Sequence, residues 1–225
     1  MFMTIEASKY IIRLAKYDDI DFLTETVLQA EKSSSGMCGM ANYFEITEDE
    51  LRNYIKQAFE EDVDGCELSV SSFLVMEYDG KVVAAMGGWL EGENEDKMPS
   101  SLLKSNLLMY VMPRDKVLKS QENAEVIKDL NVEKEMGAYQ LEYSYILPEH
   151  RGQFLLQDLT EAHTARAKSL LAKKIQGHAF EANKIILLTN KSMGFKITKK
   201  FVSNHPRILE FYPYNTIVLM EKEIK

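Results

Sequence analysis

The sequence predicts a mixed α/β fold in which short strands and amphipathic helices alternate along the chain. Three observations support this prediction. Asp79-Gly80 separates two apolar runs, which is a strong signal of a β-hairpin. A strand, a turn and a helix follow one another over residues 141–156. A second, shorter helix over residues 183–193 is stopped by Gly194.

The N-terminal elements are predicted as a strand, two helices and the hairpin. Residues 10–15 form the strand, and Asp18 or Asp19 can cap a helix whose apolar face carries Ile20, Leu23, Val27 and Ala30. Residues 33–39 break that helix. Thr47-Glu-Asp-Glu50 is a capping box in front of a second amphipathic helix. Residues 73–78 and 81–90 are the two strands of the hairpin.

Residues 91–137 separate the hairpin from the next strand. They begin with a polar run, continue with a Leu/Met-rich segment over 102–112 and include a predicted helix over 121–130. A segment this long with its own apolar residues is expected to fold. We predict one domain over residues 1–225, with an insertion at about 91–137 between the third and fourth strands. Its role as a lid, a dimer contact or additional packing stays open.

The C-terminal elements follow in regular order. A strand ends at Pro148, a long helix runs from Arg151 to Ala172, and a strand covers residues 175–180. A helix over 183–193 precedes a final strand pair over 195–202 and 216–223. Gly194 is expected in the left-handed region after a helix end, where a side chain costs energy.

The strand–turn–helix over residues 141–156 predicts an anion site. The first N–H groups of a helix have no partner within the helix, so they can bind a diphosphate through the backbone alone. The candidate binding residues are Arg151, Gly152, Gln153, Phe154, Leu155 and Leu156. Asn183 is a predicted cap of the helix that follows.

The composition excludes several classes of function. A net charge of −8 and a pI near 5.2 argue against binding to nucleic acid or to an anionic membrane. No signal peptide and no run of eighteen apolar residues is evident, so a cytoplasmic protein is expected. Cys38 and Cys66 are predicted to be buried free thiols, and no spacing of Cys or His predicts a metal site.

These motifs carry a family resemblance. The pattern Ile146-Leu-Pro148-Glu-His-Arg151-Gly152, followed by a long helix and by Asn183 to Gly194-Phe195, resembles the GNAT superfamily of N-acetyltransferases. The resemblance implies a mostly antiparallel central sheet flanked by helices. It also implies that the strand ending at Ile146 binds the pantetheine arm of acetyl-CoA through its backbone. The turn would bind the pyrophosphate, and Asn183 would meet the pantetheine arm.

The activity that the resemblance implies is transfer of an acetyl group from acetyl-CoA to a primary amine. The acceptor would be a small molecule, an amino sugar or a peptide, and a homodimer is an option. Phe154 and Leu156 stand where the family has small residues, and they either crowd the cofactor or point into the core. Asn190 stands where the family often has a tyrosine acid, and an amide cannot serve as that acid. A catalytically inactive GNAT-like domain that binds an acyl-CoA or another ligand, or a protein-interaction module, is the alternative.

Two residues of the strand are the catalytic candidates. Glu142 lies beside the expected thioester, where a carboxylate could take the proton of the ammonium directly or through one water. Strict alternation would place Glu142 on the face of Ser144 and Ile146. Tyr143 and Tyr145 would then share the other face, where either hydroxyl could replace the missing acid, and Tyr145 is our candidate. The four histidines, His150, His163, His178 and His205, show no triad or metal spacing and stay unassigned.

Overall fold

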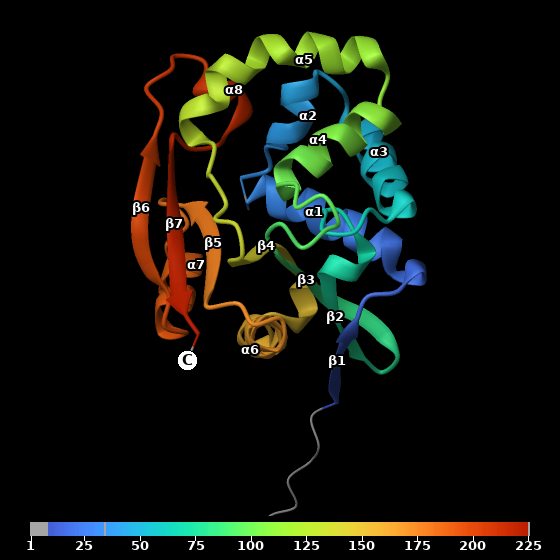
Figure 1. Cartoon of the computed structure of the whole chain (residues 1–225), viewed down its shortest axis with the longest axis vertical. Helices are drawn as coiled ribbons and strands as arrows, with labels where there is room; N and C mark the ends of the chain where they lie inside the picture. The colour runs from blue at the N-terminus through green and yellow to red at the C-terminus, as the bar shows by residue number, and fades with distance from the viewer. Residues whose placement is uncertain (1–8, 34, 225) are drawn as a thin grey trace, which may run out of the picture.

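The structure is a computed structural model that describes residues 9–33 and 35–224 (Figure 1). The strands are β1 (Tyr10–Leu14), β2 (Phe73–Tyr78), β3 (Lys81–Leu90), β4 (Tyr139–Ile146), β5 (Lys174–Phe180), β6 (Lys196–Val202) and β7 (Thr216–Glu223). The helices are α1 (Ile20–Lys32), α2 (Gly39–Phe44), α3 (Glu48–Glu61), α4 (Ser100–Val111), α5 (Arg114–Ile127), α6 (Leu155–Ser169), α7 (Lys184–Ser192) and α8 (Ile208–Phe211).

Within the described residues, seven strands form one sheet in the order β1-β2-β3-β4-β5-β7-β6. Strands β4 and β5 are parallel, and the other neighbouring strands are antiparallel. This mixed, mostly antiparallel sheet confirms the predicted fold class. The predicted hairpin is also confirmed: Tyr78 pairs with Lys81, and Asp79 and Gly80 both have positive φ, 48° and 75°, as a tight two-residue hairpin turn requires.

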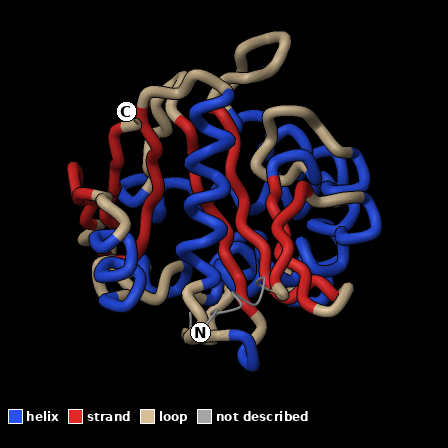
Figure 2. The backbone as a smooth tube through the Cα atoms, turned by 90° about the horizontal axis from the view of Figure 1, so that it is seen from below, coloured by secondary structure: helices blue, strands red, loops and turns tan. Residues whose placement is uncertain are grey.

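Helices cover both faces of the sheet. Figure 2 shows α6 lying along the strands on one face. Its Leu155 and Leu159 pack against apolar residues of β2 and β3, such as Leu74 and Met86. On the opposite face, α1, α3 and α4 share a core with residues of β2 and β3 that point the other way, such as Phe73. Alternate residues of a strand reach opposite faces, so each strand contributes to both layers.

Most predicted elements are confirmed, and the differences have local causes. The short helices α2 and α8 were not predicted, because four to six residues carry too little periodicity. Helix α5 begins at Arg114, earlier than the predicted residue 121. Helix α6 begins at Leu155 rather than near Arg151, because Gly152 and Phe154 have φ angles of 79° and 60°, outside the helical region.

A β-bulge interrupts β4 at Tyr143. Met86 pairs with Ser144 and Gly87 pairs with Glu142, so Tyr143 is an extra residue, and its φ is 52°. The bulge breaks the alternation that the sequence predicted. Glu142 lies on the α1 side of the sheet with Tyr143 and Tyr145, whereas Ile146 packs in the core of α6. The predicted grouping of Glu142 with Ser144 and Ile146 is therefore wrong.

The segment between β3 and β4 folds over the α1 side of the sheet. Helix α4 adds Leu103, Leu107 and Leu108 to the core there, so packing is one role of the segment. Asn123 of α5 donates a 3.0 Å hydrogen bond to the carbonyl of Tyr43 in α2. Met109 and Tyr110 of α4 are exposed. A homodimer through such residues stays a prediction.

Two further sequence expectations concern cysteines and membranes. Cys38 and Cys66 are buried free thiols, as predicted. Burial raises the pKa of the Cys66 thiol to about 11, so it stays protonated at neutral pH. In the described part of the chain, every helix is too short or too polar to cross a membrane.

Candidate functional site

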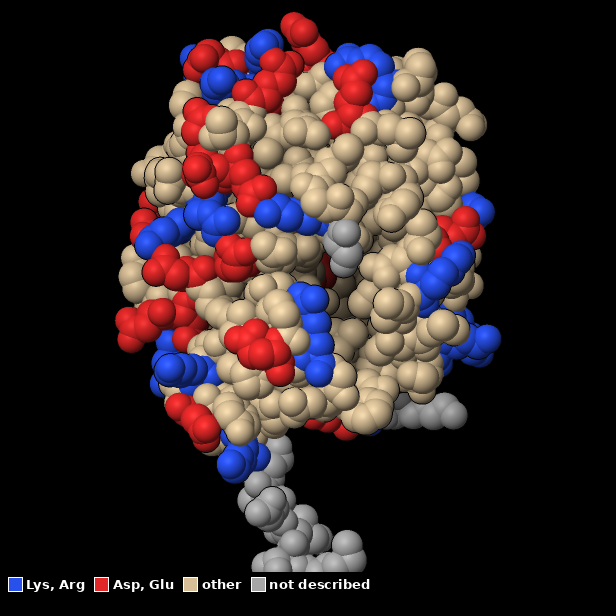
Figure 3. Space-filling view, turned by 180° about the vertical axis from the view of Figure 1, so that it is seen from behind, with Lys and Arg blue, Asp and Glu red and all other residues tan. Residues whose placement is uncertain are grey.

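Strands β4 and β5 separate after a short paired stretch. Tyr139 to Leu141 pair with Ile175 to Gly177, and beyond these residues the two facing edges have no ladder between them. We call this opening the fork. Unpaired strand edges present free N–H and C=O groups, which can bind an extended ligand. Figure 3 shows a hollow near the middle of one face of the molecule, with acidic atoms at its depth.

A charged cluster lies beside the fork and consists of Glu67, Lys104, Lys134, Glu142 and His178. Glu67 is fully buried and pairs with both lysines. The hydroxyl of Tyr143 donates a 2.8 Å hydrogen bond to Glu67. Burial by itself raises the pKa of Glu67, but the two lysines outweigh burial and hold that pKa well below its ordinary value. A buried carboxylate is tolerated here because it is paired on both oxygens.

Glu142 and His178 face each other across the fork. The Oε1 atom of Glu142 lies 3.1 Å from Nζ of Lys134 and 3.4 Å from Nδ1 of His178. Burial lowers the pKa of His178, and the charge of Glu142 opposes this effect without cancelling it. The imidazole is therefore neutral at pH 7 and able to accept a proton.

Glu31 and Tyr212 extend the site toward α1 and α8. Burial raises the pKa of the Glu31 carboxyl, while the charge of Lys104 lowers it. Burial also raises the pKa of the Tyr212 hydroxyl, and the charges of Glu31 and Glu142 add to this effect. Charges of the cluster therefore act on both Glu31 and Tyr212.

Tyr145, the second predicted catalytic residue, lies on the same side of the sheet but makes different contacts. Its ring lies 6.1 Å from that of Phe22 in α1. The guanidinium carbon of Arg151 lies 5.9 Å from the centre of the Tyr145 ring. Tyr145 therefore connects the site to the turn in front of α6 rather than to the charged cluster.

The turn proposed to bind an anion lies directly before α6, which begins at Leu155 rather than near Arg151. Within residues 9–33 and 35–224, the N–H groups of Leu155 and Leu156 donate no hydrogen bond. The side chain of Arg151 closes the turn, because its Nε donates a 3.0 Å hydrogen bond to the carbonyl of Ile146. Gln153 accepts a hydrogen bond from the hydroxyl of Tyr10. The start of α6 is therefore open to an anion.

The two large residues of the turn point in different directions. Leu156 packs against the core beneath α6, so its side chain leaves the turn free. Phe154 is 71% exposed and caps α6 in a left-handed conformation, with a φ of 60°. Of the two orientations that the sequence left open, Leu156 has the one that points into the core. The ring of Phe154 lies at the surface.

The asparagines of α7 have structural partners. Asn183 caps α7, because its Oδ1 accepts a 3.3 Å hydrogen bond from the N–H of Ile186. This confirms the predicted cap. Asn190 donates a hydrogen bond to Sδ of Met220, with 3.6 Å between the two atoms. Gly194 ends the segment with a φ of 91°, the left-handed value predicted for it.

Comparisons with known proteins identify the fold. No family model and no curated protein matches this chain. An N-acetyltransferase from Staphylococcus aureus Mu50 is 15% identical and has a TM-score of 0.64, over 94% of this chain and 99% of that one. The chain has the GNAT N-acetyltransferase fold.

Two further solved structures share the GNAT fold with this chain. A ribosomal-protein-alanine N-acetyltransferase from Brucella melitensis is 15% identical, with a TM-score of 0.57 over 95% of this chain and 99% of that one. A protein from Salmonella typhimurium, whose structure contains its cofactor acetyl-CoA, is 12% identical. Its TM-score is 0.53, over 97% of this chain and 95% of that one.

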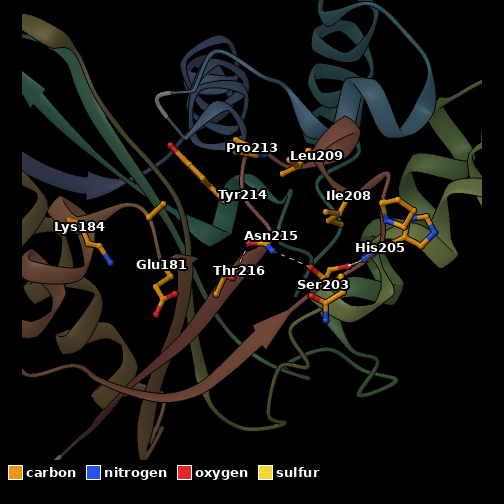
Figure 4. Close-up of a pocket in the computed structure, with 13 residues that line it drawn as sticks. Glu181, Lys184, Ser203, His205, Ile208, Leu209, Pro213, Tyr214, Asn215 and Thr216 are labelled. Atoms are coloured by element: carbon orange, nitrogen blue, oxygen red, sulfur yellow. Dashed lines mark hydrogen bonds between the residues drawn. The ribbon is translucent and has the colours of Figure 1, made fainter.

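A separate cavity of about 670 Å³ lies at the end of the GNAT sheet where β5, β6 and β7 meet their loops (Figure 4). Its lining includes Ser203 and Asn215, which are joined by a 3.3 Å hydrogen bond from Nδ2 of Asn215 to the carbonyl of Ser203. The ring of Phe180 packs against Tyr214, another lining residue, at 5.5 Å. None of the predicted site residues lines this cavity.

Sequence reasoning missed much of the charged cluster. Glu67 and Lys104 lie in a loop and in α4, and Lys134 lies in the segment before β4. His178 was noted, but no spacing gave it a role. Contacts between distant parts of the chain bring these residues to the fork of the GNAT fold, so no local pattern could have found them. A glutamate or a histidine within an apolar stretch was the one available signal.

Proposed function

We propose that this protein transfers an acetyl group from acetyl-CoA to a primary amine. The observation that carries the proposal is the fork itself, which opens beside the carboxylate of Glu142. An extended thioester arm could pair with the free edges of the strands and end close to an acid–base group. The acetyltransferases that share the fold support this reading.

The cofactor would be acetyl-CoA, bound by the backbone of β4 up to Ile146 and by the turn before α6. The residues proposed to bind its diphosphate are Arg151, Gly152, Gln153, Phe154, Leu155 and Leu156. The unpaired N–H groups at the start of α6 and the charge of Arg151 both favour an anion. Asn183 would meet the pantetheine arm while it caps α7.

The acceptor would be an amine of a small molecule, an amino sugar or a peptide. Binding both reactants at the fork lowers the entropic cost of their encounter, and direct attack on the thioester needs little more than correct placement. Glu142 is the predicted proton acceptor, directly or through one water. Tyr145 or a water would return a proton to the leaving thiolate.

Calorimetric titration with acetyl-CoA tests this proposal, with CoA and a CoA analogue that lacks the 3′-phosphate as controls. We expect a dissociation constant on the order of micromolar. Arg151→Ala should weaken binding about tenfold, because it removes a charge near the phosphates and the bond that closes the turn. A folded protein that does not bind acetyl-CoA would contradict the proposal.

An inactive acyl-CoA-binding domain is the second candidate. The amide of Asn190 favours it, since this group is bonded to Met220 and cannot protonate a thiolate. Acetyl-CoA binding without acetylation of any amine in a broad panel would support that candidate. Turnover of an amine would exclude it.

A further inference from the structure

We propose that His178 is the base that takes the proton of the acceptor ammonium and that Glu142 is a positioning residue for it. This inference rests on the proposed acetyl transfer and assigns the proton step of the same site to an imidazole. It replaces the direct role of Glu142 that the sequence predicted.

The position of His178 in the sheet is the first argument. Gly177 of β5 and Leu141 of β4 are the last residues that pair across the two strands, so His178 and Glu142 are the first residues past the point of separation. The side chain of His178 is 34% exposed, while that of Glu142 is 9% exposed. Of these two groups, the imidazole is the one more open to a ligand in the fork.

The contacts of the two groups give the second argument. Glu142 lies 3.1 Å from the ammonium of Lys134, which is itself paired with Glu67. Nζ of Lys134 also lies 4.9 Å from the centre of the Trp89 ring, so the lysine is held on several sides. The carboxylate of Glu142 is thus already engaged by a fixed cation.

The two nitrogens of the imidazole have different surroundings. Its Nδ1 faces Oε1 of Glu142 at 3.4 Å. In the described ranges 9–33 and 35–224, its Nε2 makes no hydrogen bond. A carboxylate beside Nδ1 favours the tautomer that carries the proton there, which leaves the lone pair of Nε2 as the acceptor. Glu142 lies at ion-pair distance from Nδ1, where its charge can hold His178 in the tautomer that a histidine base needs.

The charges around His178 fix its protonation state. Burial and the ammonium groups of Lys134 and Lys104 lower the pKa of the imidazole, while the carboxylates of Glu142 and Glu67 raise it. The net shift is downward, so the neutral form dominates at pH 7. An imidazole must be neutral before it can take a proton, and this condition is met at physiological pH.

In the proposed reaction, two protons leave the acceptor nitrogen. Nε2 of His178 takes one proton from the ammonium of the acceptor, and the neutral amine attacks the carbonyl carbon of the acetyl thioester. The new C–N bond forms, the C–S bond breaks, and the amine nitrogen loses its second proton. The thiolate of CoA takes up this second proton, directly or through a water, and His178 returns to its neutral form by releasing the first proton to water.

Steady-state kinetics over a range of pH test the assignment. The amines are glucosamine, 2-phenylethylamine and a peptide with an amino-terminal alanine, and acetyl-CoA affinity is measured in parallel. His178→Gln should lower kcat/KM about 100-fold or more and leave acetyl-CoA affinity unchanged. The variant should also lose the fall in rate at acidic pH that protonation of His178 causes in the original protein.

Glu142→Gln should keep this acidic fall in rate but move its midpoint to lower pH. The carboxylate raises the pKa of His178, so its removal lowers that pKa further. If Glu142 only supported the fold, Glu142→Gln would lower the rate without moving the pH midpoint of the acidic fall. His205→Gln is the matched control, because His205 lies in the loop after β6 and accepts a hydrogen bond from the N–H of Arg207. The variant His205→Gln should leave kcat/KM and its pH dependence unchanged.

Long-range proton–nitrogen NMR of the histidine rings provides a second readout that needs no acceptor. The spectrum of His178→Gln identifies the signals of His178. We expect a neutral ring with its proton on Nδ1 at pH 7. A ring protonated on Nε2 alone, or on both nitrogens, would overturn the proposal even where none of the amines is acetylated.

The results separate the two proposals. No acetyl-CoA binding by the folded protein contradicts the proposed function. Acetyl-CoA binding and turnover with an unchanged rate in His178→Gln contradict the assignment of His178 alone. Loss of the rate in Glu142→Gln together with an active His178→Gln would return the role of base to Glu142.

Discussion

At the scale of single residues, Phe154 holds a backbone conformation that its side chain disfavours. Its φ of 60° belongs to the left-handed region, which costs a non-glycine residue about 1–2 kcal/mol. Its ring is exposed and gains little from packing. The chain therefore keeps a strained residue at the start of α6, where the cofactor is proposed to bind.

We predict that Phe154→Gly raises the free energy of unfolding by up to about 1 kcal/mol. The relief of backbone strain is partly offset by the greater flexibility of glycine in the unfolded chain, about 0.5–1 kcal/mol. Urea denaturation measures the change. Phe154→Ala removes the ring but keeps the strain, so it should show no such gain.

Acetyl-CoA affinity of the same variants reports on the ring. We expect Phe154→Gly to bind acetyl-CoA at least as well as the original protein, because the turn binds through its backbone. Loss of binding with the fold intact would show that the site uses the phenyl ring.

At the scale of elements, Glu67 joins three parts of the chain that are distant in sequence. It lies in the loop before β2, and its partners come from α4, from the segment before β4 and from β4 itself. The segment between β3 and β4 is thus fixed to the fork by ion pairs as well as by its apolar residues. A change at Glu67 should disturb all three parts together.

Glu67→Gln should lower the free energy of unfolding by about 3 kcal/mol, because Lys104 and Lys134 would lose the buried carboxylate that balances them. Thermal and urea unfolding measure this loss. Glu60→Gln, on the exposed face of α3, should change stability by less than about 0.5 kcal/mol. Equal effects of the two changes would show that the buried pairs add nothing to stability.

At the scale of the whole molecule, a buried histidine makes stability depend on pH. His163 of α6 is fully buried, and burial lowers its pKa to about 3. Its two ring nitrogens are bonded to the hydroxyl of Tyr139 at 2.8 Å and to the carbonyl of Met86 at 3.0 Å. The folded protein therefore excludes a proton that the unfolded chain accepts.

The direction of the pH effect follows from this difference. Between the ordinary histidine pKa of about 6.5 and the folded value, the unfolded chain binds more protons, so stability falls as the pH decreases. One such group accounts for about 1.4 kcal/mol per pH unit. Glu67 acts in the same direction at lower pH, because its lowered pKa gives stability that is lost once the carboxylate is protonated.

We expect His163→Gln to have a shallower decrease in stability between pH 6.5 and 4.5 than the original protein. Glutamine cannot bind the proton that the histidine of the unfolded chain binds. Urea denaturation at several pH values gives the slope for each protein. Equal slopes in His163→Gln and the original protein would contradict a role for His163 in the pH dependence of stability.

The sequence by itself determined the elements whose causes are local. Asp79-Gly80 fixed the hairpin because both residues tolerate positive φ. Thr47 and Glu50 fixed the start of α3, since each bonds to the backbone of the other. The strand, turn and helix over residues 141–156 were predictable for the same reason. The helix, α6, begins later than predicted because Gly152 and Phe154 of the turn have left-handed backbone conformations.

Only the tertiary structure decided which side chains meet at the fork. The bulge at Tyr143 depends on how β4 pairs with β3, and it moved Glu142 to the face opposite the predicted one. His178 faces Glu142 because β5 runs parallel to β4 and then separates from it. Lys134 and Glu67 join them from segments far away in the chain. Local sequence patterns specify the backbone over a few residues, whereas the charges of a site are brought together by packing over the whole chain.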